Sequence, residues 1–132
     1  MCATQQKSMS KSKDMNISNL IREQIVSNPV LIFMKGSPKQ PKCTFSSNAA
    51  AALISTNLPF AHIDILQSIE IQQALPQISE WPTFPQIFID SELIGGGDII
   101  IELNEAGKLK PIMEAAINKA AHRLYPNSGH KE

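Results

Sequence analysis

A single cysteine stands where this sequence could perform thiol chemistry. Cys43 follows an apolar run, Val30 to Met34, and a loop over residues 35–42, and it opens a Ser/Ala-rich stretch that is typical of a helix. A thiol at a helix N-terminus faces unpaired amide N–H groups and, with two lysines nearby, ionises more easily. Such surroundings can lower a cysteine pKa from about 8.5 to roughly 3.5–7.5. We therefore predict a reactive thiol. The alternative is a buried cysteine that packs as a small hydrophobic residue.

The chain has one further cysteine, Cys2, which lies in a segment without a helix or strand pattern. An internal structural disulfide is therefore not expected. The residue three positions after Cys43 is Ser46, whereas a Cys-x-x-Cys pair would be needed to resolve a mixed disulfide within one chain. We expect the second thiol of any reaction to come from another molecule.

Length and composition restrict the class of protein. A chain of 132 residues is long enough for one domain with its own core. Lys+Arg and Asp+Glu balance at 12 each, so no net field recruits nucleic acid. No apolar stretch is long enough to cross a membrane. We expect a disordered tail over residues 1–15, a domain over 16–121 and a flexible tail over 122–132, because the ends lack apolar periodicity.

The N-terminal segment also bears on localisation. It lacks the apolar centre of a signal peptide and the arginines of a transit peptide. Free cysteine chemistry fits a reducing compartment better than a secreted protein. We expect a cytoplasmic protein, with the mitochondrial or plastid matrix as the alternative.

Apolar periodicity predicts an α/β domain. The run Val30 to Met34 is apolar without alternation, as in a strand covered on both faces, and the helix after it leads to a second strand in a parallel βαβ unit. The expected elements, in order, are a helix over Ile17 to Ile25, a strand over Val30 to Met34, a helix over Cys43 to Ser55, a strand over Phe60 to Ile65, a helix over Ser68 to Ser79, a hairpin of Gln86 to Ile89 with Leu93 and Ile94, and two helices, one through Ala106 and one over Leu109 to Ala120. This order predicts a four-stranded mixed sheet flanked by helices.

Three segments are expected to meet at one edge of this sheet. Ligands bind beyond the carboxyl ends of parallel strands, and Lys35 and Cys43 both follow such an end. The proline of Thr83-Phe84-Pro85 is a candidate for a cis peptide bond, which would leave the Phe84 backbone free to pair with an extended peptide. The turn Gly95-Gly96-Gly97-Asp98 enters a helix whose N–H groups suit a carboxylate. Together they predict a groove for a short, thiol-bearing, anionic peptide.

These motifs resemble those of the monothiol glutaredoxins, whose active site reads Cys-Gly-Phe-Ser. The resemblance covers about Ile17 to Ala121. The matching segments are Met34-Lys35-Gly36-Ser37-Pro38, Cys43-Thr44-Phe45-Ser46, Ile63-Asp64-Ile65-Leu66, Trp81-Pro82-Thr83-Phe84-Pro85-Gln86 and Gly95-Gly96-Gly97-Asp98. The resemblance implies a thioredoxin-like fold, glutathione binding and carriage of a [2Fe-2S] cluster by a homodimer.

The resemblance also implies roles for individual residues. Cys43 would be the catalytic thiol and the cluster ligand; a two-iron cluster needs four thiolates, which one Cys43 and one glutathione from each of two subunits supply. The remaining roles all concern glutathione: Lys35 and Gln72 would face its glycine carboxylate, the Phe84 backbone would pair with its cysteinyl unit beside Thr83 and Pro85, and Gly97 and Asp98 would hold its γ-glutamyl end.

Two positions depart from the pattern of that family. Thr44 replaces the glycine after the cysteine and narrows the backbone options of the loop, which could crowd a cluster. Gln72 stands where the family commonly has an arginine, so it donates hydrogen bonds without charge and would weaken glutathione binding.

The leading interpretation is an iron-sulfur carrier that hands clusters to acceptor proteins, and the resemblance implies a BolA-family protein as a candidate heterodimer partner. It would be a binding protein more than an enzyme. The alternative is a glutathione-dependent thiol-disulfide oxidoreductase that uses Cys43 alone, and a third is a redox-inert adaptor. The long loop between Lys35 and Cys43 favours the carrier.

Overall fold

The structure, a computed structural model, describes residues 16–124. Its centre is one mixed sheet with the strand order β2-β1-β3-β4. The strands are β1 (Val30–Met34), β2 (Ala61–Asp64), β3 (Gln86–Ile89) and β4 (Glu92–Gly95). The four-stranded mixed sheet expected from the sequence is confirmed, and it has the thioredoxin-like arrangement.

β1 is a central strand. It pairs in parallel with β2, with Met34 opposite Asp64, and antiparallel with β3, with Leu31 opposite Phe88. All five of its residues are buried, which explains why its sequence is apolar without alternation. The parallel register brings the carboxyl ends of β1 and β2 to the same edge of the sheet.

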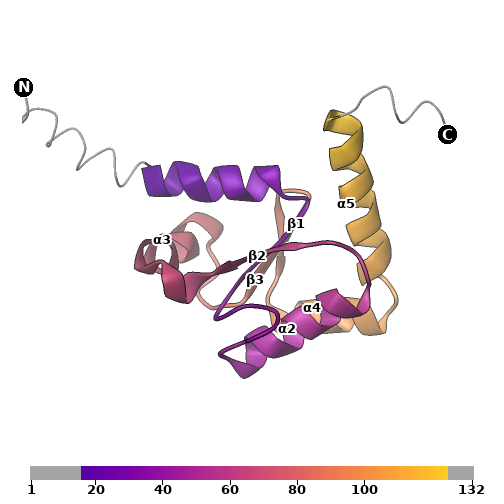
Figure 1. Ribbon diagram of the computed structural model, residues 1–132, viewed down its shortest axis with the longest axis horizontal. Coiled ribbons are helices and arrows are strands. Elements are labelled where there is room, and N and C mark those ends of the chain that lie inside the picture. Colours follow the sequence, from indigo (N-terminus) through magenta and orange to yellow (C-terminus); the bar gives the residue numbers. More distant parts are fainter. Residues whose placement is uncertain (1–15, 125–132) are drawn as a thin grey trace, which may run out of the picture.

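Helices cover both faces of the sheet (Figure 1). The N-terminal helix over residues 16–27 and α3 (Ile69–Ser79) pack with Leu31 and Phe33 on one face. The other face carries three helices, α2 (Thr44–Ser55), α4 (Gly97–Glu105) and α5 (Leu109–Leu124). Successive side chains of a strand point to opposite faces, so β1 contributes to two cores at once.

β2 and α5 end at residues other than the predicted ones. β2 ends at Asp64, because the Asp64 side chain accepts the Leu66 N–H and begins the short 3₁₀ helix η1 (Ile65–Gln67). α5 continues to Leu124, so the first three residues of the expected C-terminal tail are helical. His122 and Arg123 in its last turn suit the negative end of the helix dipole. The tails predicted over 1–15 and from 125 onward lie outside the described residues. Of the helices described, none is both long and apolar enough to span a membrane.

Candidate functional site

Cys43 is the N-cap residue of α2 and lies partly exposed in an extended conformation. The backbone N–H of Ser46 lowers the pKa of the Cys43 thiol below its usual value, although burial acts in the opposite direction. The Phe45 N–H, the charge of Lys35 and the Ser46 hydroxyl lower this pKa further. Each of these groups stabilises the thiolate, as expected for a cysteine at a helix N-terminus.

Ser46 connects the thiol to the end of β1. Its side chain is fully buried, and its hydroxyl oxygen accepts the Lys35 N–H at 3.1 Å. The Ser46 hydroxyl proton remains available to the Cys43 thiolate, and this hydroxyl helps to lower the pKa of the Cys43 thiol. From the sequence, Ser46 was only the residue in place of a second cysteine, and its contact with the Lys35 N–H was not predicted.

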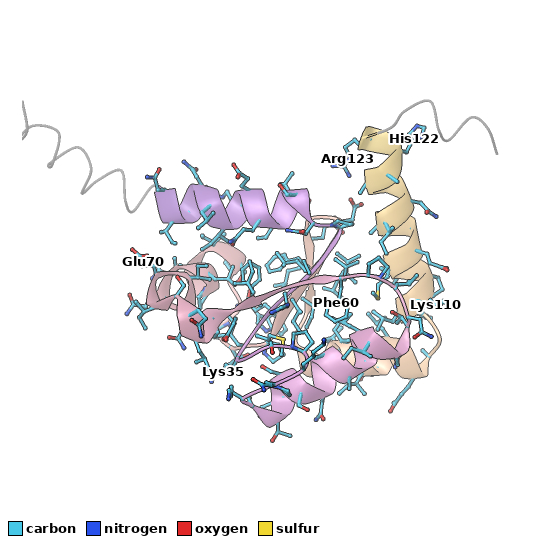
Figure 2. The ribbon with its side chains drawn as sticks, in the orientation of Figure 1. Lys35, Phe60, Glu70, Lys110, His122 and Arg123 are labelled. Atoms are coloured by element: carbon cyan, nitrogen blue, oxygen red, sulfur yellow. The ribbon has the colours of Figure 1, made fainter. Side chains whose placement is uncertain are left out.

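The loop between β1 and α2 is a compact hairpin. Gly36 and Pro41 form an isolated antiparallel bridge, and the Lys42 N–H donates to the Lys35 carbonyl at 2.9 Å. Gly36 has a φ of 90°, and a Cβ there would lie 2.5 Å from the Gln40 carbonyl oxygen, so only glycine fits. The hairpin thus returns the chain to the edge from which it left. Figure 2 shows Lys35 at this edge, beside the start of α2.

An open groove of about 860 Å³ lies next to Cys43. It brings together all eight residues that the sequence analysis placed in the site: Lys35, Cys43, Gln72, Thr83, Phe84, Pro85, Gly97 and Asp98. Six further residues that line the groove were not predicted as site residues: Phe45, Pro76, Trp81, Pro82, Gly96 and Ile99. These are mostly apolar and form walls, so their chemistry gave no signal. The individual ligand roles of the eight residues stay predictions.

Several polar groups in the groove are free to meet a ligand. Within residues 16–124, no side-chain hydrogen bond or ion pair holds Lys35, Gln72 or Asp98. The peptide bond between Phe84 and Pro85 is cis, as the sequence suggested, and no hydrogen bond in the described chain uses the Phe84 backbone. The groove therefore offers a cation, a carboxylate, an amide and an unpaired strip of main chain.

The wall that contains the cis proline is held by Gln86. This side chain is fully buried, and its amide nitrogen donates to the Trp81 carbonyl at 2.8 Å and to the Thr83 carbonyl at 3.2 Å. Trp81 lines the groove, while its indole Nε1 is buried beside Gly96 without a partner in the described residues. Trp81 is therefore a packed aromatic residue of the groove wall.

The glycine turn at the start of α4 also allows α4 to pack closely against α2. A Cβ added at Gly97 would lie 3.2 Å from the Phe45 carbonyl oxygen, which is a tight contact with the first turn of α2. Gly97 therefore lets α4 approach α2 closely, and it places Asp98 at the rim of the groove. This close approach of the two helices was not predicted from the sequence, which indicated only ligand-binding roles for the turn.

Thr44 lies on the other side of the thiol. It lines a smaller hollow of about 310 Å³ with Pro41, Lys42 and Ser47, and Cys43 borders both this hollow and the groove. The threonine that replaces the family's glycine therefore borders this second hollow and not the groove, so it leaves the predicted glutathione contacts clear.

The described residues provide one thiol to the site. In residues 16–124, no three His, Cys, Asp or Glu side chains are close enough together to hold a metal ion. His62 is exposed on β2, and Cys2 and His130 lie outside the described residues. Any cluster bound at Cys43 must therefore take further ligands from elsewhere.

Comparison with known proteins identifies the family. The sequence profile of the glutaredoxin family matches residues 30–94, from β1 into β4. Glutaredoxin 4 from Haemophilus influenzae (strain 86-028NP) is 48% identical over 101 residues, which cover 76% of this chain and 94% of that relative. The chain belongs to the glutaredoxin family. Because its motif Cys43-Thr44-Phe45-Ser46 holds one cysteine, it is a glutaredoxin of the monothiol type.

Two solved glutaredoxins share the fold. Reduced apo GrxS14 from poplar is 38% identical with a TM-score of 0.65, and the match covers 76% of this chain and 92% of that one. A buckwheat glutaredoxin, solved as its glutathione complex, is 25% identical with a TM-score of 0.70, and the match covers 80% of this chain and 94% of that one. The family resemblance and the thioredoxin-like fold expected from the sequence are confirmed.

Proposed function

We propose that this glutaredoxin binds glutathione in the groove beside Cys43 and carries or transfers a [2Fe-2S] cluster as a glutathione-bridged homodimer in iron-sulfur cluster assembly. The observation that carries this proposal is the placement of one thiol, with a lowered pKa, in a groove whose polar groups are free. Because ligation requires a thiolate, a lowered pKa favours binding at neutral pH.

Glutathione suits the free groups of the groove. Its glycine carboxylate would meet the Lys35 ammonium and the Gln72 amide, and its γ-glutamyl ammonium would meet the Asp98 carboxylate. The unpaired Phe84 backbone would pair with the cysteinyl unit as a short added strand. The glutathione complex of the buckwheat glutaredoxin supports this assignment.

A cluster would be cargo shared between two chains. An all-cysteine two-iron cluster takes four thiolates, and each subunit would contribute Cys43 and one bound glutathione. The partly exposed position of Cys43 at the rim of the groove supports ligation from both molecules. By family resemblance, we further propose a BolA-family protein and iron-sulfur acceptor proteins as partners, and a cytoplasmic location.

The lowered pKa of Cys43 also favours a second candidate, a glutathione-dependent thiol-disulfide oxidoreductase. The Cys43 thiolate would attack the glutathione sulfur of a mixed disulfide and release the target as a thiolate. A second glutathione would then attack the Cys43-glutathione disulfide, which regenerates Cys43 and leaves glutathione disulfide. The buried Ser46 cannot take the part of the second thiol, so we expect this turnover to be weak.

Anaerobic reconstitution tests the proposal. The protein is mixed with iron and sulfide, with and without glutathione, and the visible absorption of the cluster is recorded. We expect a cluster only with glutathione, and none with Cys43→Ser. A cluster that survives Cys43→Ser would refute the ligation scheme, and disulfide reduction as fast as that of a dithiol glutaredoxin would favour the second candidate.

A further inference from the structure

Asp64 lies at the end of β2, outside the groove, yet it holds the segment that carries Lys35. Its carboxylate oxygen Oδ1 accepts the Gly36 N–H and the Leu66 N–H, both at 2.9 Å. The parallel register puts Asp64 opposite Met34, the residue before Lys35. Asp64 is not among the residues that line the groove. A ligand in the groove would therefore not contact Asp64 directly.

Three hydrogen bonds fix the main chain on both sides of the Lys35 side chain. The Lys35 N–H donates to Ser46 Oγ at 3.1 Å, and the Lys35 carbonyl accepts the Lys42 N–H at 2.9 Å. The third is the bond from the Gly36 N–H to Asp64. The partners come from α2, the hairpin and β2. Rotation of either peptide group of Lys35 would therefore break at least one of them.

We propose that Asp64 is a positioning residue for the glutathione site: by holding the Gly36 N–H it keeps the Lys35 side chain in the groove beside Cys43. This inference rests on the proposed function, because it is measured through glutathione binding. It adds a contribution from a residue that touches neither the thiol nor the ligand.

The chemistry of Asp64 supports a firm hold. Burial raises the pKa of its carboxyl group, but the N–H groups of Gly36 and Leu66, the Gln67 side chain and the charge of His62 together outweigh this effect, and the pKa lies below the usual value. The group therefore accepts as a carboxylate, which forms stronger hydrogen bonds than a neutral oxygen. Gly36 has no side chain to anchor the turn, and a larger residue does not fit there. The position of the turn consequently depends on the hydrogen bonds that its main-chain groups make, including the one to Asp64.

A double-mutant cycle tests the inference. Glutathione is titrated calorimetrically into protein with Cys43 changed to serine, which prevents disulfide exchange, and Asp64→Ala and Lys35→Gln are introduced singly and together. We expect Asp64→Ala to weaken binding by about three- to tenfold while Lys35 is present, and by less than about twofold with Lys35→Gln. Equal losses in both backgrounds would overturn the inference, because a general structural effect would be additive.

Asp90→Ala is the matched control, since Asp90 is also a hydrogen-bonded aspartate but lies at the β3–β4 turn. It should leave the affinity unchanged. If Asp64→Ala does not fold, Asp64→Asn decides by the same criterion, with a smaller loss expected because asparagine keeps an oxygen acceptor. If the parent protein does not bind glutathione, the proposed function fails. If the parent protein binds glutathione and Lys35→Gln weakens binding but Asp64→Ala does not, the inference on Asp64 is wrong while the proposed function stands.

Discussion

Asp64 and Asp90 lie at opposite ends of β1 and hold their surroundings in different ways. Asp64 accepts two backbone N–H groups at the end where Cys43 lies. Asp90 lies beside the start of β1, where its N–H donates to the Pro29 carbonyl, and its carboxylate meets Lys119 at 3.0 Å and Arg123 at 3.7 Å. Figure 2 shows Lys35 and Arg123 at these two distant ends.

The two aspartates differ in how firmly they hold their partners. The two main-chain groups that Asp64 holds have little freedom to move, and the Gln67 side chain is a further partner of its carboxylate. The side chains of Lys119 and Arg123 are 64% and 55% exposed, so their ion pairs with Asp90 are screened by water and cost side-chain entropy. Asp64 therefore holds the main chain next to Lys35 at one end of the sheet, whereas Asp90 attaches α5 at the other end.

Substitution of two glycines gives the largest expected contrast. Gly36→Ala should lower the free energy of unfolding by roughly 2–4 kcal/mol. The new Cβ would clash with backbone atoms of the hairpin, and the positive φ at this position is unfavourable for alanine. Gly107→Ala, with a φ of 73° and nothing within 4 Å, is the matched control and should cost only about 1–2 kcal/mol. Chemical denaturation measures both. Equal losses would mean that the hairpin adapts and is not precisely built.

Ser46→Ala should alter both stability and reactivity at the thiol end. It leaves the Lys35 N–H without its partner, at a cost of about 1–3 kcal/mol, and it removes one group that lowers the Cys43 pKa. The alkylation rate of Cys43 should therefore rise at a higher pH than in the parent protein. An unchanged rate profile would show that the backbone N–H groups alone set this pKa.

The lowered pKa of the Cys43 thiol makes the free energy of unfolding depend on pH. Deprotonation favours the folded state, so the contribution is fully present above the pKa of the unfolded chain. It is lost as the pH falls through the folded-state pKa. The pH dependence of unfolding in the parent protein, compared with Cys43→Ser, isolates this contribution, and identical curves would contradict it.

Lys35→Gln removes the positive charge of the Lys35 side chain, which lies in the groove beside Cys43. We expect glutathione to bind about tenfold more weakly or worse, since a hydrogen bond to a charged group contributes about 1.5–3 kcal/mol and Gln72 carries no charge. Calorimetric titration in the Cys43→Ser background measures this. Lys39→Gln is the control, because Lys39 is an exposed lysine of the same loop that does not line the groove. Equal affinities for Lys35→Gln and the parent would remove Lys35 from the site.

The smallest effect is expected at the other end of the sheet. Asp90→Ala should lower the free energy of unfolding by at most about 1 kcal/mol, because exposed ion pairs contribute little. The loss should shrink further at high salt, which screens such pairs. Denaturation at two salt concentrations measures it. A loss well above that of Ser46→Ala would reverse the comparison between the two ends.

Local patterns were enough to predict most of the fold. The apolar run of β1 and the Gly/Pro residues around it gave the strand bounds, and β3 was also predicted with its observed bounds. The groove could be predicted because Lys35, the Thr83-Phe84-Pro85 segment and Asp98 all follow or precede strands at one edge of the sheet. The end of α5 at Leu124 was less clear, because a polar helix end and a polar tail have similar composition.

The supporting contacts could not be predicted from local sequence. The bond from Gly36 to Asp64 joins residues 28 positions apart, and it depends on the register between β1 and β2. The contact of Gln86 with the Trp81 carbonyl depends on the path of the loop around the cis proline. Such bonds use common residue types, whose chemistry becomes specific only through placement.

The central claim is that each chain offers one thiol to a shared cluster and that glutathione provides the rest. Native mass spectrometry of the reconstituted protein tests it most directly, because the mass counts every component. We predict a dominant species of two chains, two glutathione molecules and one [2Fe-2S] cluster, which is lost with Cys43→Ser. A cluster on a single chain, or a dimer that holds a cluster without glutathione, would contradict the account.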